Sequence, residues 1–254
     1  MIKFFRKIRQ KLLTENKFTK YLIYAIGEIV LVVIGILLAL QINNSNERRK
    51  TEILEMQYLN RIEQDLISDI EYFDRRINES DNLVKAHYFF IHQAYLEQSN
   101  AVKFRELVAN INLNSEHLIT QNTTYLELQN AGRMNILKND LLKSKIIFLY
   151  KEIEIKSSHI KEYNEATAGR LQDLSLTFFK YWDPYKEIFD DPEMFNDNEW
   201  NFINDPSSDK FRILEEVIAH YTAKHSIFKG YFIELKAKVE TLKDEIKDEI
   251  KKRT

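Results

Sequence analysis

Glycine, proline and cysteine are scarce in this chain of 254 residues, which has five Gly, three Pro and no Cys. Sandwiches, barrels and doubly wound α/β folds place Gly and Pro in their many turns, so the composition argues against all three. The lack of Cys excludes disulfides, thiolate metal sites and cysteine nucleophiles. Apolar residues make up 44% and charged residues 30%, which is typical of a folded chain. The sequence therefore predicts an all-α protein with long helices and few connections.

The sequence also lacks most motifs that are typical of catalytic, nucleotide-binding or metal sites. The glycines are too far apart for a phosphate-binding loop or a nucleophile elbow. No His stands three residues after a Glu, as the ligands of a di-iron helical bundle do, and there is no H-E-x-x-H. Acidic residues are so numerous that chance alone brings pairs of carboxylates together. We therefore expect no catalytic site, no cofactor and no metal, and we do not expect an enzyme.

One apolar segment lies near the N-terminus. Residues 21–42 contain a single charged residue, Glu28, and are long enough to cross ~30 Å of hydrocarbon as a helix. A buried core helix would carry a polar stripe, which residues 29–40 lack. A cleavable signal peptide would have a shorter apolar core and an A-x-A site after it. The segment is therefore predicted to be an uncleaved signal anchor, which is a single transmembrane helix.

A basic leader precedes this segment. Residues 1–20 carry seven Lys and Arg against one acidic residue, Glu15, and their apolar residues recur at spacings of three and four. This pattern is typical of a short amphipathic helix that lies on an anionic membrane surface. We therefore expect the leader to bind membrane lipid from the cytoplasmic side.

The basic residues also predict the orientation. Seven precede the apolar segment and four lie in the twenty residues after Ile42, so the N-terminus is placed in the cytoplasm. Residues 43–254 are then expected to form a periplasmic domain of a protein in the cytoplasmic (inner) membrane. That domain has 30 basic and 37 acidic residues, and its net negative charge argues against binding to nucleic acid.

Long helices are predicted from the spacing of apolar residues. Residues 44–97 contain neither Gly nor Pro, so the first helix is expected to leave the membrane without a break. A second is expected from a cap at Asn139 or Asp140 to about Trp182, and a third over about 209–251. Apolar residues in the third helix alternate at steps of three and four, as in a coiled coil or a four-helix bundle. This seam consists of Phe211, Leu214, Ile218, Tyr221, His225, Phe228, Phe232, Leu235, Val239, Leu242 and Ile246.

The chain between the first two long helices is predicted to be a broken helix. Residues 101–111 form one short piece, Thr124 and Glu127 fit a capping box that begins another, and Gly132 ends it. The fold expected is an elongated antiparallel bundle with up-down-up-down order and a broken second helix. Residues 183–208, which hold all three prolines, form its one long loop.

Two groups of residues are candidates for contacts with partners. Glu28, Gly35 and Ala39 share one stripe of the apolar helix, where small residues permit close contact with another helix. Either this stripe is such an interface, or Glu28 reaches water near the inner surface of the membrane, or it relays protons. The second group lies in the 183–208 loop and beside it. Its aromatic residues either cap the bundle or form a partner-docking surface, because Trp and Tyr dominate interface hot spots. These residues are Trp182, Tyr185, Phe195 and Trp200.

His225 is the one polar residue in the seam of the last helix, and His87 is a second candidate for a core position. A buried histidine with its hydrogen bonds satisfied is the main interpretation, and a bundle that responds to pH is the alternative. Histidines within one helix of this chain are five residues apart, so they point in different directions and do not converge on a metal ion.

Two stretches resemble a known family. The opening MIKFFRKIRQKLLTENKFTKYLIYAIGEIVLVVIGILLALQINN and the later TTYLELQNAGRMNILKND are similar to segments of a family of uncharacterised membrane proteins common in Bacteroidota. Members usually have Trp shortly after the span, where this chain has Ser45. The resemblance implies a basic leader, one N-terminal transmembrane helix and a helical periplasmic domain. It implies no activity and no functional residues.

The chain is therefore expected to be a single-span protein whose helical domain acts by protein–protein interaction or scaffolding. Its expected partner is a membrane or periplasmic protein, or a further copy of the chain. The alternative is a ligand-sensing four-helix-bundle subunit that signals through a partner, since a leader of about twenty residues provides no output domain. Buried polar residues that converge between helices would favour sensing, and an exposed aromatic tip would favour docking.

Overall fold

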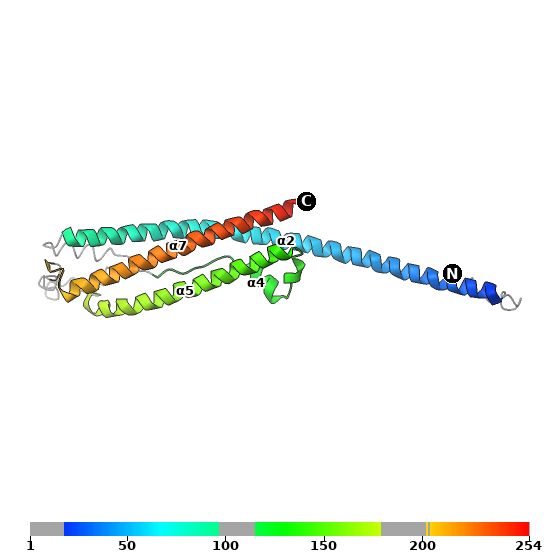
Figure 1. Ribbon diagram of the computed structural model, residues 1–254, viewed down its shortest axis with the longest axis horizontal. Coiled ribbons are helices and arrows are strands. Elements are labelled where there is room, and N and C mark those ends of the chain that lie inside the picture. The colour runs from blue at the N-terminus through cyan, green and yellow to red at the C-terminus, as the bar shows by residue number, and fades with distance from the viewer. Residues whose placement is uncertain (1–17, 97–114, 179–201, 203, 254) are drawn as a thin grey trace, which may run out of the picture. The chain divides into compact units, whose positions relative to one another are not determined.

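The computed structural model describes residues 18–96, 115–178, 202 and 204–253, and every regular element in these ranges is helical (Figure 1). The prediction of an all-α protein is confirmed, with helices α2, α4, α5 and α7 forming a bundle. The elements are α2 (Phe18–Leu96), α4 (Thr123–Asn130), the short 3₁₀ helix η1 (Met134–Ile136), α5 (Asp140–Phe178) and α7 (Asp209–Lys251).

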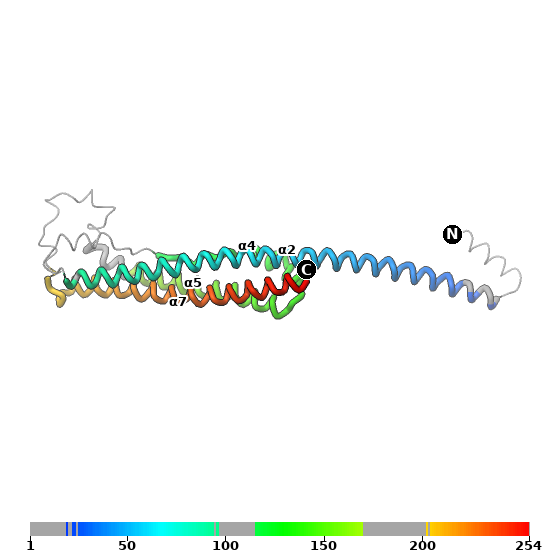
Figure 2. Tube along the Cα trace, turned by 90° about the horizontal axis from the view of Figure 1, so that it is seen from above, coloured from blue at the N-terminus to red at the C-terminus, as the bar shows by residue number. Residues whose placement is uncertain are grey.

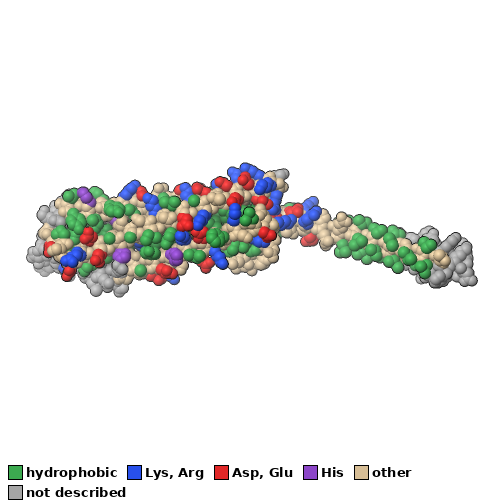
Figure 3. All heavy atoms as spheres, in the orientation of Figure 1, with side chains coloured by type: hydrophobic (Ala, Val, Ile, Leu, Met, Phe, Trp, Pro, Cys, Tyr) green, Lys and Arg blue, Asp and Glu red, His purple; other side chains and the backbone are tan. Residues whose placement is uncertain are grey.

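The chain forms two compact units, Met1–Gln57 and Tyr58–Thr254. In the first unit, the large apolar side chains of residues 22–42 are 46–71% exposed, and Figure 3 shows them on the surface of the helix. Among the described residues, one helix is long and apolar enough to cross a membrane, and a signal sequence near the N-terminus has the same features. Helix α2 is continuous from Phe18 to Leu96, which confirms the prediction that the first helix is unbroken.

The second unit is built around three long helices whose directions follow from ion pairs. Lys145 pairs with Glu245 and Lys156 with Glu234, so α5 and α7 are antiparallel, as predicted. Helix α7 is also antiparallel to α2, which it contacts through Lys236–Asp74 and Lys229–Asp81 pairs. Figure 2 shows α7 running beside α5 and α2.

The core of this unit lies along α7, whose observed bounds are those predicted. All eleven residues of the predicted seam are buried, and six of them have no exposed surface. They pack against a stripe of α2 and the inner side of α5, since burying apolar surface is the main favourable contribution to folding. The facing residues include Leu59, Ile62, Leu66 and Phe73 of α2, and Leu142, Ile146, Leu149, Ile153 and Ile160 of α5.

The predicted capping box at Thr124 is wrong. Helix α4 begins at Thr123, its N-cap residue is Asn122 without a side-chain capping bond, and the Thr124 side chain is buried inside the helix. The reason lies in tertiary contacts of Glu127. Its carboxylate does not fold back onto the helix N-terminus, because it accepts hydrogen bonds from the Tyr58 hydroxyl and from Arg61, each at 2.7 Å.

The broken helix predicted between α2 and α5 is also only partly correct. Residues 115–122 are not helical, and α4 is the one α-helix described between α2 and α5. The short helix expected at 101–111 lies outside the described residues. The predicted cap at Asn139 is confirmed, since its side-chain oxygen accepts the N–H of Leu142 at 3.1 Å.

Gly132 ends α4, as predicted. It has a φ of +63°, its N–H donates to Gln129 at 3.1 Å, and the N–H of Arg133 donates to Leu128 at 2.8 Å. These two bonds close the helix end in the arrangement that calls for a left-handed residue.

Gly132→Ala is expected to destabilise the protein by about 1 kcal/mol, because a Cβ is strained at positive φ. Gly230→Ala is the matched control and is expected to stabilise it by about 0.5–1 kcal/mol, since Gly230 lies inside α7 with open space around its Cβ position. Urea unfolding of the full chain in detergent measures both. A shift of the same sign for both variants would contradict this account of Gly132.

Candidate functional site

The predicted contact residues of the apolar helix lie in the first unit. Glu28 is half-buried, whereas Gly35 and Ala39 are exposed, and a Cβ added at Gly35 would meet no atom within 4 Å. Space for a neighbouring helix is therefore open at Gly35, and the interface itself stays a prediction. The four aromatic residues predicted to dock a partner, Trp182, Tyr185, Phe195 and Trp200, lie outside the described residues.

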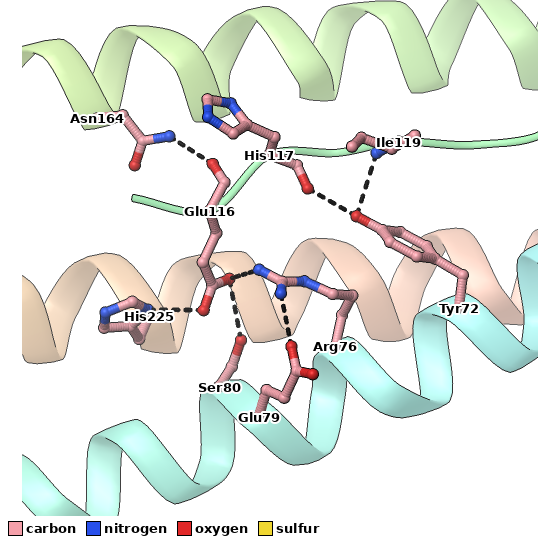
Figure 4. Close-up of polar contacts among 9 residues, drawn as sticks. All are labelled: Tyr72, Arg76, Glu79, Ser80, Glu116, His117, Ile119, Asn164 and His225. Carbon is pink, nitrogen blue, oxygen red and sulfur yellow. Dashed lines mark hydrogen bonds and ion pairs between the residues drawn. The ribbon is translucent and has the colours of Figure 1, made fainter. Parts of the chain in front are cut away.

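A buried polar cluster in the second unit was not predicted, and it is built around an extended segment. Residues 115–122, here called the strap, are not helical. Several of their backbone groups are therefore satisfied by side chains of α2 and α5. Figure 4 shows part of this arrangement. From α2, the Tyr72 hydroxyl donates to the carbonyl of His117 (2.6 Å) and accepts from the N–H of Ile119 (3.1 Å). The carboxylate of Asp69, also on α2, accepts from the N–H of Gln121 (2.7 Å). From α5, Tyr150 donates to the carbonyl of Gln121 (3.2 Å) and Asn164 donates to the carbonyl of Glu116 (2.5 Å).

The carboxylate of Glu116 is the centre of the cluster, and its side chain is only 5% exposed. Arg76 Nη2 lies 2.9 Å from Oε2, and the Ser80 hydroxyl donates to the same oxygen at 3.4 Å. Nδ1 of His225 lies 3.1 Å from Oε1, close enough for an ion pair although the N–H is not aligned for a hydrogen bond. Arg76 also donates to Glu79 at 2.5 Å. One carboxylate of the strap thus joins α2 to α7 (Figure 4).

The charges around Glu116 decide its ionisation. Burial alone would raise the pKa of this carboxyl, but the contact with His225 and the charge of Arg76 bring it below its usual value. Lys224 is a nearby buried cation, whose ammonium lies 4.3 Å from the centre of the Tyr221 ring. Burial lowers the pKa of Lys224 to about 8, against the opposing charge of Glu116. The cluster therefore favours an ionised carboxylate.

His225 occupies the core position predicted for it, and His87 is buried as well. The two rings lie 5.6 Å apart, with Tyr221 beside both. Spacing within one helix does not reveal this pairing, because the histidines come from α2 and α7. Among the described residues, no group of three or more His, Asp or Glu side chains is arranged to hold a metal ion.

A cavity of about 580 Å³ opens beside the cluster. It borders both Arg76, whose side chain is 18% exposed, and the start of the strap. Tyr72 and Leu83 contribute apolar wall, whereas Glu79 and Asn82 contribute polar groups. The cavity is of the size that small organic ligands occupy in proteins.

The other end of the strap contacts Asp69 of α2, whose charge is influenced by Asp65 on the same helix. Asp69 is buried, and the Oδ2 atoms of Asp65 and Asp69 have no hydrogen-bond partner among the described residues. Burial raises the pKa of Asp69 to about 7, against the hydrogen bond from Gln121 N–H and with a smaller contribution from the charge of Asp65. Burial also raises the pKa of Tyr150, the aromatic residue that closes this end.

The pKa of Asp69 predicts that stability falls as pH rises from about 4 to about 7. In this window the folded state keeps a proton that the unfolded state, with a pKa of 3.8, has lost. Stability contributed by Asp69 is therefore complete below about pH 4 and absent above about pH 7, with a slope of up to about 1.4 kcal/mol per pH unit.

Asp69→Asn should remove this dependence, because an amide does not titrate. Urea unfolding of both proteins at several pH values between about 5 and 8 measures the difference. A wild-type slope that Asp69→Asn leaves unchanged would show that another group titrates there.

An apolar groove between α5 and α7 is a second candidate site. It has a volume of about 700 Å³ between α5 and α7 and is lined mainly by apolar surface. Phe148, 67% exposed, forms its wall, and Leu149 and Leu242 lie at its floor. Leu141 and Ile155 are also exposed and stand seven residues before and after Phe148. These three residues continue one apolar stripe along the outside of α5.

A sequence signal for both candidate sites exists. Asp69, Tyr72, Arg76 and Ser80 follow each other at steps of three and four, which places a polar stripe on α2 beside its apolar one. The spacing of Leu141, Phe148 and Ile155 likewise indicates a second apolar stripe on α5. Neither pattern reveals that Glu116 meets Arg76 and His225, because that contact joins three separate parts of the chain.

A protein-family model matches residues 28–204, more than half of the chain, and it describes a family of unknown function (DUF6090). No curated protein and no solved structure matches the chain.

Proposed function

We propose, from the premise that the chain belongs to the family of unknown function DUF6090, that it is a membrane-anchored helical protein that acts by binding another protein. The observation that carries this proposal is the exposed apolar segment of α2. Residues 22–42 expose large apolar side chains, whose contact with water is unfavourable. In this proposal the N-terminus is cytoplasmic and the bundle lies in the periplasm, as the distribution of basic residues predicts.

The α5–α7 groove supports the second half of the proposal. The charged residues at its rim are already neutralised by ion pairs between the two helices, Lys145–Glu245 and Lys238–Glu152. The groove therefore combines an apolar floor with a rim that carries little net charge. A groove between two helices accepts the apolar face of a third helix. The occupant we propose is therefore an amphipathic helix of a partner protein, and a second copy of this chain would be a different result of the test.

Phe148→Glu tests this proposal, because the residue is exposed and its replacement is not expected to affect folding. The full chain is crosslinked in its native membrane, and the proteins that co-purify are identified. Phe148→Glu should abolish a specific crosslink that Tyr88→Glu, at an equally exposed aromatic residue outside the groove, leaves intact. Crosslinks that survive Phe148→Glu would overturn the groove as the contact surface.

An export-dependent reporter fused after Thr254 tests the orientation, and it should be active. Activity of a cytoplasmic reporter at the same position would overturn the periplasmic placement.

Ligand sensing is a second candidate function, and the polar cluster around Glu116 favours it. Chains of buried polar side chains between helices are unusual, because each polar group must find a partner inside the bundle. Here α2 and α7 both contact one carboxylate that belongs to neither helix. Displacement of that carboxylate would release a link between two long helices, which is the kind of change that a partner protein can detect.

A further inference from the structure

We propose that Arg76, Ser80 and His225 form a binding site for a small organic carboxylate, and that Glu116 of the strap occupies this site in the structure described. The inference rests on the sensing function proposed above and names its ligand class. When a free acid takes the place of Glu116, the strap loses its link to α2 and α7.

The geometry is that of a carboxylate site. A guanidinium nitrogen at 2.9 Å and a hydroxyl at 3.4 Å approach one oxygen, and an imidazole nitrogen at 3.1 Å approaches the other. Arginine is the side chain best suited to hold a carboxylate, because its donors form a planar fork. Arg76, Ser80 and His225 are fixed on helices, whereas Glu116 arrives on an extended segment (Figure 4). The site therefore persists when the strap's own carboxylate leaves it.

The adjoining cavity provides room for the rest of a ligand. Arg76 and Glu116 both line it, so a molecule in the cavity lies next to the carboxylate that it would replace. Nε of Arg76 is buried and has no hydrogen-bond partner within the described part of the chain, so the guanidinium retains a donor. Tyr72 and Leu83 offer apolar wall to a short carbon chain.

The local charges select an anion. Removing Glu116 would take away one of the two carboxylates with which Arg76 pairs in the described part of the chain, leaving Glu79. The Arg76 side chain is mostly buried, and a buried cation is unfavourable without opposing charge, so the vacated site would attract a negative group. A cationic or neutral ligand would not replace the charge of Glu116.

Competition with Glu116 sets the concentration of ligand that is required. A carboxylate tethered by a short strap acts at an effective concentration in the millimolar range or above. A simple acid such as propionate should therefore bind the native protein at tens of millimolar, on the order of that effective concentration. Any change that weakens Glu116 as a competitor should lower this concentration.

The first test is rescue of Glu116→Ala in the full chain in detergent. Sodium propionate should raise its melting temperature in a saturable manner, beyond the effect of equal sodium chloride or of propanamide, the neutral amide of similar shape. Arg76→Met combined with Glu116→Ala should not respond. A Glu116→Ala protein that propionate stabilises no more than chloride does would overturn the site.

The second test does not depend on the folding of Glu116→Ala. The chain has no Cys, so Ser115→Cys carries a single environment-sensitive label on an exposed strap position. Propionate should change the label's fluorescence saturably, and Glu116→Gln should lower the midpoint about tenfold, because a neutral amide competes less well than a carboxylate. No saturable response in either protein, or equal midpoints, would overturn the proposal.

These outcomes are separable from those of the proposed function. If the label fails to respond to propionate, the conclusion from the Phe148-dependent crosslink is unaffected. If that crosslink is not found, the conclusion on carboxylate binding is unaffected. If propionate binds and the crosslink pattern also changes, the two proposals are joined in one sensory mechanism.

Discussion

Leu235→Asp is expected to lower the unfolding free energy of the bundle by several kcal/mol or to prevent folding. Leu235 lies in the middle of α7 with none of its surface exposed, and replacing it removes a buried apolar side chain and introduces a carboxylate without a partner. Loss of a buried Leu alone costs about 2–5 kcal/mol, and burying an unpaired charge adds to this. Urea unfolding of the full chain in detergent, followed by circular dichroism, measures the effect.

Ile233→Asp is the matched control, because Ile233 is on the same helix and 49% exposed. Its effect should stay within about 0.5 kcal/mol, as for most surface substitutions. Equal unfolding free energies for Leu235→Asp and the wild type would mean that this side of α7 faces water, and the bundle would be wrong.

Arg76→Met is expected to destabilise the protein by about 3–5 kcal/mol, because it leaves the carboxylate of Glu116 buried without its cation. Methionine keeps an apolar chain similar to the stem of the arginine side chain, so loss of packing contributes less. On α7, the close contact of His225 with Glu116 and the charge of nearby Lys224 compensate in part. The same unfolding measurement applies.

Glu116→Gln separates the energy of the Arg76–Glu116 interaction from the effect of each side chain alone. Adding it to Arg76→Met should recover part of the lost stability, because a buried amide is far less unfavourable than a buried unpaired charge. The double-mutant cycle then gives a coupling energy between Arg76 and Glu116 of about 1–3 kcal/mol. Purely additive effects would show that the 2.9 Å contact contributes nothing to folding.

The pH dependence of the pair has a defined sign. The pKa of Glu116 is lowered on folding, and burial is the largest opposing influence. Its contribution to stability is therefore present above its ordinary pKa of 4.5 and is lost as pH falls below that value. Asp69 acts in the opposite direction at higher pH, so the two ends of the strap respond to acid differently.

Local patterns were reliable where one helix decides the outcome. The seam of α7 predicted both bounds of the helix and the burial of eleven residues. An apolar stripe that repeats over many helical turns is removed from water only when that side of the helix faces the core. Gly132 and Asn139 were also predictable, since a helix end requires a left-handed residue or a side-chain acceptor within a few positions. The capping box at Thr124 failed because Tyr58 and Arg61, distant in the chain, contact Glu127.

The sequence by itself determined that the chain is helical, that its first helix continues unbroken out of an apolar segment, and which side of α7 is buried. These properties depend on spacing within one segment. Only the tertiary structure decided that residues 115–122 form an extended strap and that Glu116 lies between Arg76 and His225. The physical reason is that a buried polar group must find partners wherever the fold brings them. Those partners lie 40 residues before Glu116 and more than 100 residues after it. The spacing of residues within one helix gives no information about contacts over such separations.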